Sequence, residues 1–168
     1  MLLFIRKIFI YSKENLKSSW VTMNFFVLEY IQGVIMMKII AAFDSFKESM
    51  TACEAGEAVQ RVYNNVHICP LADGGEGTME VMNRYLHGDI HEIEVAGPLF
   101  KTVHAKLAIV DDLAIIESAQ ACGLDYLTEE EKNGTEATSY GVGEMMKYAY
   151  DHGVKRFLLT LGGSACND

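Results

Sequence analysis

Three short loops contain the residues of this 168-residue chain that are best suited to chemistry. They span residues 44–47, 72–78 and 162–168, and each follows an apolar segment. Glycine lets a backbone approach a ligand closely, and successive N–H groups can form a concave site for an anion. A helix that begins at Thr78 would add the positive end of its dipole. The loops therefore predict a site for phosphate or another small anion.

Charged side chains in these loops add to that chemistry. Lys47 offers a positive charge to a phosphate or a carboxylate, and Asp73, Glu76 and Asp168 have the oxygens to hold Mg²⁺ or to accept a hydroxyl proton. Glu117 ends an apolar strand, where an acid needs a partner. Two interpretations of Glu117 stay open, a binding residue and a helix cap.

Several well-known site patterns do not occur in the sequence. It has neither the G-x-x-x-x-G-K-S/T phosphate loop nor the G-x-S-x-G turn of a serine nucleophile. Its four cysteines are widely spaced, with neither a C-x-x-C pair nor a histidine at metal-ligand spacing. We interpret them as reduced thiols of a cytoplasmic protein. The residues alone thus predict an α/β protein with a phosphate site.

Composition narrows the class of protein further. Half of the residues are hydrophobic, 22% are charged, and the formal net charge is −9. Such a chain can bury a core, which excludes a disordered or low-complexity protein. The excess of acidic residues argues against a nucleic-acid partner, because phosphate backbones are bound by basic patches.

The first 36 residues differ from the remainder of the chain. They contain four basic and two acidic residues, whereas residues 37–168 contain ten basic and twenty-one acidic residues. Their apolar stretches are too short for a membrane span, which needs roughly 20 continuous apolar residues. We expect the domain to begin at Met37 and to occupy residues 37–168, with residues 1–36 as a leader outside it. The alternative is an appendage that packs on the domain or on a membrane surface.

Hydrophobic periodicity positions the loops between strands and helices. It predicts strands at 38–43, 66–71, 90–95, 102–110, 113–117 and 155–161. It also predicts helices from Thr51, from Thr78 through Leu86 with Gly88 as the stop, and from Thr138 or Ser139 to about Tyr150. This order predicts an α/β fold in which parallel strand–helix units flank an antiparallel β insert. The chain ends after a strand and a loop, so we expect the fold to be incomplete at the C-terminus.

Six segments together resemble the glycerate kinase family that phosphorylates glycerate at the 2-position. They are KIIAAFDSFK (38–47), PLADGGEGT (70–78), VAGPL (95–99), IESA (116–119), ATSYGVGE (137–144) and GGSACND (162–168). The resemblance spans residues 37–168 in the right order. Four positions depart from the family pattern: Phe43 and Gly134 replace proline, Glu48 replaces glycine, and Cys166 replaces threonine. The family is also much longer than this chain.

The resemblance implies phosphorylation of D-glycerate to 2-phosphoglycerate, with ATP and Mg²⁺ as cofactors. It implies that Lys47 and Ser45 hold the glycerate carboxylate or the transferred phosphoryl group. Asp44, Asp73 or Asp168 would serve as general base or metal ligand, with Asp73 and Asp168 as the candidates for Mg²⁺. The other expected substrate- or phosphate-binding residues are Gly74, Gly75, Glu76, Gly77, Thr78, Glu117, Gly162, Gly163, Ser164 and Asn167.

The length of the chain leaves three functional hypotheses. The first is a glycerate kinase fragment that is inactive by itself, and the second is one half of a split enzyme with a separately encoded C-terminal half. The third is a non-catalytic small-molecule binding or scaffold domain that has the fold without the chemistry.

Overall fold

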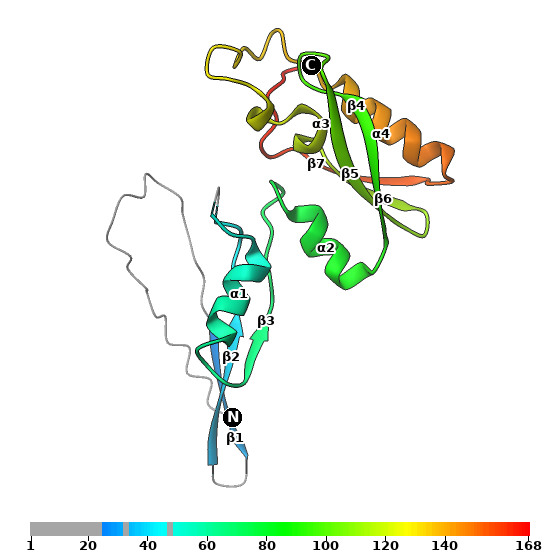
Figure 1. The fold of residues 1–168 in the computed structure, drawn as a ribbon. Coiled ribbons are helices and arrows are strands. Elements are labelled where there is room, and N and C mark those ends of the chain that lie inside the picture. The colour runs from blue at the N-terminus through cyan, green and yellow to red at the C-terminus, as the bar shows by residue number, and fades with distance from the viewer. Residues whose placement is uncertain (1–24, 32–33, 47–48) are drawn as a thin grey trace. The chain divides into compact units, whose positions relative to one another are not determined.

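The computed structural model describes residues 25–31, 34–46 and 49–168. These residues belong to two compact units, one ending at Ala72 and the other spanning Asp73 to Asp168. Figure 1 traces both units and labels their elements. Most of the proposed leader, together with Lys47 and Glu48, lies outside the described residues.

The described residues of the first unit form a three-stranded sheet and one helix. Strand β1 (Phe25–Ile31) pairs antiparallel with β2 (Val34–Ala41), and β2 pairs parallel with β3 (Val66–Ile68). Helix α1 (Ala52–Gln60) connects the two parallel strands. It begins in a capping box, in which the Thr51 hydroxyl accepts the Glu54 N–H and the Glu54 carboxylate accepts the Thr51 N–H. The core of this unit joins Ala41, Phe43 and Ala55.

The second unit is built on a four-stranded sheet in the order β4-β5-β6-β7. Strands β4 (Asp89–Ala96), β5 (Thr102–Val110) and β6 (Leu113–Glu117) form an antiparallel meander, and β7 (Arg156–Thr160) pairs parallel with β6. Its helices are α2 (Thr78–Leu86), α3 (Ala119–Cys122), α4 (Tyr140–Asp151) and a 3₁₀ turn η1 (Leu124–Tyr126).

Both faces of this sheet are covered by helices, because successive strand residues point to opposite faces. Leu107 and Ile116 pack with residues of α3 and α4, among them the fully buried Met145. Their neighbours Ala108 and Ile115 pack on the other face, against Met79 of α2. Figure 1 shows α4 alongside β4 and β5. The end of β6, where Glu117 lies, therefore meets helices on both faces.

The structure confirms the mixed α/β class, with parallel pairs β2–β3 and β6–β7 and an antiparallel β4–β6 segment. Two local features of the structure differ from what the sequence predicts. Strand β2 begins at Val34 and pairs with β1, so a hairpin spans the position of Met37. Helix α2 ends at Leu86, and the residue that stops it is His87 instead of Gly88, because His87 adopts the left-handed conformation at φ +55°. The domain boundary at Met37 stays a prediction.

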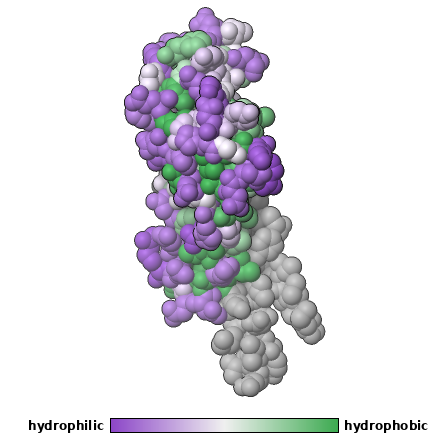
Figure 2. Space-filling model, turned by 90° about the vertical axis from the view of Figure 1, so that its right-hand side faces the viewer, coloured by the Kyte–Doolittle hydropathy of each residue, from purple (hydrophilic) through white to green (hydrophobic). Residues whose placement is uncertain are grey.

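Within residues 25–31, 34–46 and 49–168, no helix has the length and apolar character needed to cross a bilayer. On the face drawn in Figure 2, hydrophilic residues surround smaller groups of hydrophobic ones.

Two glycines of α4 give a matched test of this packing. A Cβ added at Gly141 would overlap the carbonyl oxygen of Ala96 in β4, whereas a Cβ at Gly143 would meet nothing within 4 Å. We expect Gly141→Ala to lower the free energy of unfolding by about 1–3 kcal/mol, because backbone must move to relieve the overlap. Gly143→Ala should raise it by up to about 1 kcal/mol through helix propensity.

Urea unfolding of the full chain, followed by circular dichroism, measures both variants of α4. Equal unfolding midpoints for Gly141→Ala and Gly143→Ala would contradict the close approach of α4 to β4.

Candidate functional site

The two glycine loops of the second unit lie directly against each other. The N–H of Gly162 donates to the carbonyl oxygen of Gly74 at 3.0 Å. A Cβ added at Gly162 would lie 2.6 Å from the Cα of Gly75, closer than real Cβ atoms approach another atom. Residue 162 must therefore lack a side chain for the loops to meet.

The loop at residues 73–77 is shaped by its own hydrogen bonds. The Asp73 carboxylate accepts the Gly75 N–H at 2.9 Å, and the Thr78 hydroxyl donates to the Gly75 carbonyl oxygen at 2.8 Å. Gly74 and Gly77 have φ angles of +92° and +85°, which favour glycine. The side chains of Asp73 and Glu76 are exposed beside this ordered backbone.

The buried carboxylate of Glu117 caps the helix that follows this loop. Its side chain is 2% exposed, and its Oε1 accepts the Met79 N–H at 2.5 Å in the first turn of α2. Burial raises the pKa of Glu117 above its ordinary value, while hydrogen bonds from the N–H groups of Met79 and Gly77 act in the opposite direction. Of the two interpretations left open by the sequence, the geometry favours a cap. The start of α2 is therefore neutralised by the protein itself.

The second loop is held from its other side by α3 and the residues around it. The Leu124 N–H donates to the Gly163 carbonyl oxygen at 3.0 Å, and the hydroxyls of Ser118 and Ser164 share a hydrogen bond of 2.5 Å. Gly163 has a φ of +80°. The loop is thus fixed between the 73–77 loop and the α3 region, with Gly162 and Gly163 themselves exposed.

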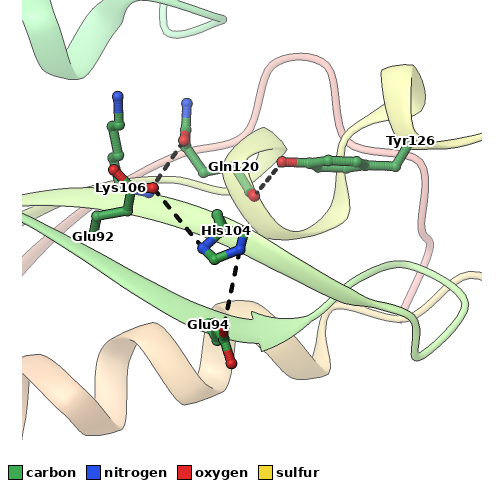
Figure 3. Close-up of polar contacts among 6 residues, drawn as sticks. All are labelled: Glu92, Glu94, His104, Lys106, Gln120 and Tyr126. Atoms are coloured by element: carbon green, nitrogen blue, oxygen red, sulfur yellow. Dashed lines mark hydrogen bonds and ion pairs between the residues drawn. The ribbon is translucent and has the colours of Figure 1, made fainter.

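Helix α3 is in turn anchored to the sheet, as Figure 3 shows. The Gln120 side chain accepts the Lys106 N–H of β5 at 3.2 Å, and the Tyr126 hydroxyl donates to the Gln120 carbonyl oxygen at 3.0 Å. Also on β5, His104 lies 3.9 Å from a carboxylate oxygen of Glu92 and 3.9 Å from one of Glu94, both on the neighbouring strand β4. Gln120 therefore fixes α3 to β5, and α3 in turn contacts the loop at residues 162–164.

The end of the chain reaches the start of α4. The Asp168 carboxylate accepts the Thr138 hydroxyl at 2.8 Å and the Ser139 N–H at 2.9 Å. These hydrogen bonds lower the pKa of Asp168, because they favour its ionised form. Asn167 is exposed beside it, close to Gly134.

The structure brings most of the predicted site residues together in the second unit. These are Asp73, Gly74, Gly75, Glu76, Gly77, Thr78, Glu117, Gly162, Gly163 and Ser164, with Asn167 and Asp168 at the start of α4. Asp44 and Ser45 belong to the first unit, where the Asp44 carboxylate accepts the Ser45 N–H at 2.8 Å. Lys47 lies outside the described residues.

Sequence reasoning missed three residues that shape this site. Ser118 bonds to Ser164, and Thr138 and Ser139 bind Asp168. Each lies inside a segment that carries the family resemblance, next to the end of a strand or the start of a helix. Polar residues at such positions were the available signal, although their partners lie far away in the sequence.

The arrangement is suited to anion binding and to charge placement. Exposed glycine backbone, the carboxylates of Asp73 and Glu76, and the ionised Asp168 lie on ordered segments of one unit. No group of three or more His, Cys, Asp or Glu side chains with metal-binding geometry occurs in the described part of the chain. Mg²⁺ does not need such a group, since it commonly binds one or two carboxylates together with substrate phosphates.

Removal of the Glu117 carboxylate tests its structural role. Glu117→Ala leaves N–H groups at the start of α2 without their buried acceptor, so we expect the free energy of unfolding to fall by about 2–3 kcal/mol. Glu80→Ala, an exposed acid in the same turn, is the matched control and should change it by less than about 0.5 kcal/mol. Chemical denaturation measures both, and a Glu117→Ala variant as stable as Glu80→Ala would contradict the cap.

The raised pKa of Glu117 also predicts how stability depends on pH. The folded chain holds the Glu117 proton more tightly than the unfolded chain, whose carboxyl has the ordinary value of 4.5. The contribution of Glu117 to stability is therefore fully present below pH 4.5 and decreases as the pH rises through the folded-state pKa. Glu117→Gln cannot titrate, so its unfolding free energy should lose this component of the pH slope. An identical slope in both proteins would disprove the shift.

Comparison with known proteins extends these observations. The sequence profile of the glycerate kinase family matches residues 39–168. A glycerate kinase from Halalkalibacterium halodurans is 40% identical over 141 residues, and one from Haemophilus influenzae is 42% identical over 140 residues. Both matches cover 79% of this chain and 37% of the relative, so the chain spans less than half the length of these relatives.

A solved structure agrees with the sequence matches. The crystal structure of a Salmonella typhimurium LT2 protein, assigned as glycerate kinase 2, superposes with a TM-score of 0.60 at 37% sequence identity. The superposition covers 77% of this chain and 37% of the other. Sequence profile, relatives and fold agree, and the chain belongs to the glycerate kinase family.

Proposed function

We propose that this chain supplies part of an enzyme that transfers a phosphoryl group from ATP to D-glycerate and forms 2-phosphoglycerate. The observation that carries the proposal is the backbone contact between Gly162 and the Gly74–Gly75 turn. It places two glycine loops, one with half-buried and the other with exposed glycines, on one surface of a chain that belongs to the glycerate kinase family, although the loops are far apart in the sequence. Phosphoryl transfer depends mainly on positioning and charge neutralisation, which such loops can provide.

The proposed anion would contact the loops and not the end of α2. Glu117 already accepts the Met79 N–H, and its negative charge opposes a second anion at that helix end. The N–H groups of Gly75, Gly77 and Gly162 are already donated to Asp73, Glu117 and Gly74. The backbone N–H groups that we assign to a phosphate are therefore those of Gly74, Glu76, Gly163 and Ser164, with Asn167 at the margin. This assignment limits the phosphate to the exposed side of the two loops.

The carboxylates differ in suitability for their proposed roles. A general base works best with a pKa near the operating pH. The Thr138 and Ser139 hydrogen bonds lower the pKa of Asp168, which makes it a weak base. We therefore assign Asp168 to charge placement or to metal binding, and leave Asp44 and Asp73 as candidates for the base. In the first unit, Ser45 and Lys47 are assigned to the glycerate carboxylate or the transferred phosphoryl group.

The residues of the second unit suit Mg²⁺ brought in by the nucleotide. Asp73 is exposed and uses Oδ1 for the Gly75 N–H, and a carboxylate can bind a metal through its second oxygen. We assign Asp73, with Asp168 as the second candidate, to hold the ion. Mg²⁺ would neutralise charge on the phosphates during transfer. A kinase that draws on the cell's ATP would work in the cytoplasm, which is the location that we propose.

The proposed activity needs more of the family fold than this chain spans. The matches cover about 37% of the length of the relatives, so we propose that the activity needs the remaining segment of the family fold together with these residues. We expect the chain alone to show no turnover of D-glycerate.

A complementation assay tests this function. The chain is assayed for ADP release with ATP, Mg²⁺ and D-glycerate, alone and co-expressed with the remaining segment of the Halalkalibacterium halodurans relative. Glycerate-dependent ADP release should require both polypeptides, and mass spectrometry should identify 2-phosphoglycerate. Release of ADP without D-glycerate would reject the proposed reaction, and D-glycerate binding without turnover would favour the non-catalytic binding domain.

Two variants in the complemented enzyme test the residues. Gly162→Ala should lower kcat/KM at least about 100-fold, because its Cβ forces the loops apart. Lys47→Ala should reduce turnover by orders of magnitude. Gly143→Ala, which meets no neighbouring atom, is the control and should retain activity. Near-normal activity of Gly162→Ala would reject the shared loop surface as the site.

A further inference from the structure

Two cysteines of the second unit lie close enough to react with each other. The Sγ atoms of Cys122 and Cys166 are 3.5 Å apart, although the residues are separated by 44 positions. Cys122 ends α3 and is 1% exposed, whereas Cys166 is partly exposed in the segment after the glycine loop. All four cysteines of the chain are thiols in the structure.

The backbone around the pair holds the two thiols in this arrangement. The Ala165 N–H donates to the Cys122 carbonyl oxygen at 2.8 Å, and the Leu124 N–H donates to the Gly163 carbonyl oxygen at 3.0 Å. Gly123 and Ser164 form a β-bridge between these two bonds. Each cysteine is therefore adjacent to a residue that is fixed to the opposite segment.

We propose that Cys122 and Cys166 form a reversible disulfide by exchange with a small-molecule disulfide such as oxidised glutathione. An S–S bond measures about 2.05 Å, so the sulfurs need to approach by only about 1.5 Å. Rotation of the side chains can supply much of that approach while the flanking hydrogen bonds stay in place. The product would be a covalent link between α3 and the segment that follows the glycine loop.

The exchange balances without another reactant. The Cys166 thiolate, which is the more accessible, attacks one sulfur of oxidised glutathione, forms a mixed disulfide and releases one reduced glutathione. The Cys122 thiolate then attacks the Cys166 sulfur and releases the second reduced glutathione. The two cysteines lose two electrons and two protons in total, and the glutathione disulfide gains them.

The position of the pair in the chain differs from that of a catalytic redox pair. The two cysteines are 44 positions apart and lie on two segments that the flanking hydrogen bonds hold together, whereas catalytic dithiols commonly occupy a C-x-x-C motif. The geometry therefore indicates a modification site.

Peptide mapping tests the proposed disulfide. The full chain is incubated with an excess of oxidised glutathione, alkylated, and digested without reductant for mass spectrometry. We expect an intact mass lower by about 2 Da and one linked peptide pair that joins Cys122 to Cys166, both reversed by dithiothreitol. The midpoint of thermal unfolding should rise by about 5–10 °C in the oxidised protein.

Matched variants separate this site from general oxidation. Cys166→Thr should abolish the linked peptide and the rise in midpoint, whereas Cys69→Ser in the first unit should leave both unchanged. Persistent reduced thiols at Cys122 and Cys166, a stable glutathione adduct on Cys166 without the internal link, or links distributed equally over all four cysteines would each overturn the proposal. A circular dichroism spectrum equal to that of the unmodified protein shows that the Cys166→Thr variant is folded.

Discussion

The close backbone contact at Gly162 is the constraint on which the second unit depends. It joins the loop after β7 to the loop before α2, and no side chain fits between them. Because β7 pairs with β6, and β6 ends at Glu117, the same region also sets the carboxylate against the first turn of α2. The absence of a side chain at Gly162 thus allows the end of β6, the start of α2 and the two glycine loops to lie together. The proposed phosphate surface exists only while all four remain together.

Glu117 changes the way in which the glycine loop and helix are understood. A glycine loop followed by a helix start commonly binds an external anion. Here the protein places its own buried carboxylate at that end, so the helix dipole contributes to stability and not to ligand binding. The exposed parts of the loops remain for a ligand, and helix α3, held to β5 through Gln120, supports them from the other side.

Hydrophobic periodicity predicts most elements of this fold because it reports burial within a short segment. It finds β5, β6 and the start of α2 at Thr78, and the glycines mark the loops. It cannot find the partner of Glu117, which is 38 positions away. Nor does it find the β1–β2 hairpin, because charge and aromatic content set those residues apart from the domain. The sequence therefore predicts which residues are candidates for the site. It does not predict which residues they contact, because those contacts depend on tertiary packing.

The parallel pairing of β6 with β7 has a consequence for how the second unit folds. The meander from β4 to β6 needs only short turns, but β7 returns to β6 after a connection that contains α3, η1 and α4. Closing that long connection costs chain entropy before any pairing is gained. We therefore expect the meander to form early and the edge strand to dock late. The surface that a nucleotide or sugar acid would meet is then among the last parts of the chain to be assembled, and local opening at that edge would dismantle it while the meander stays folded.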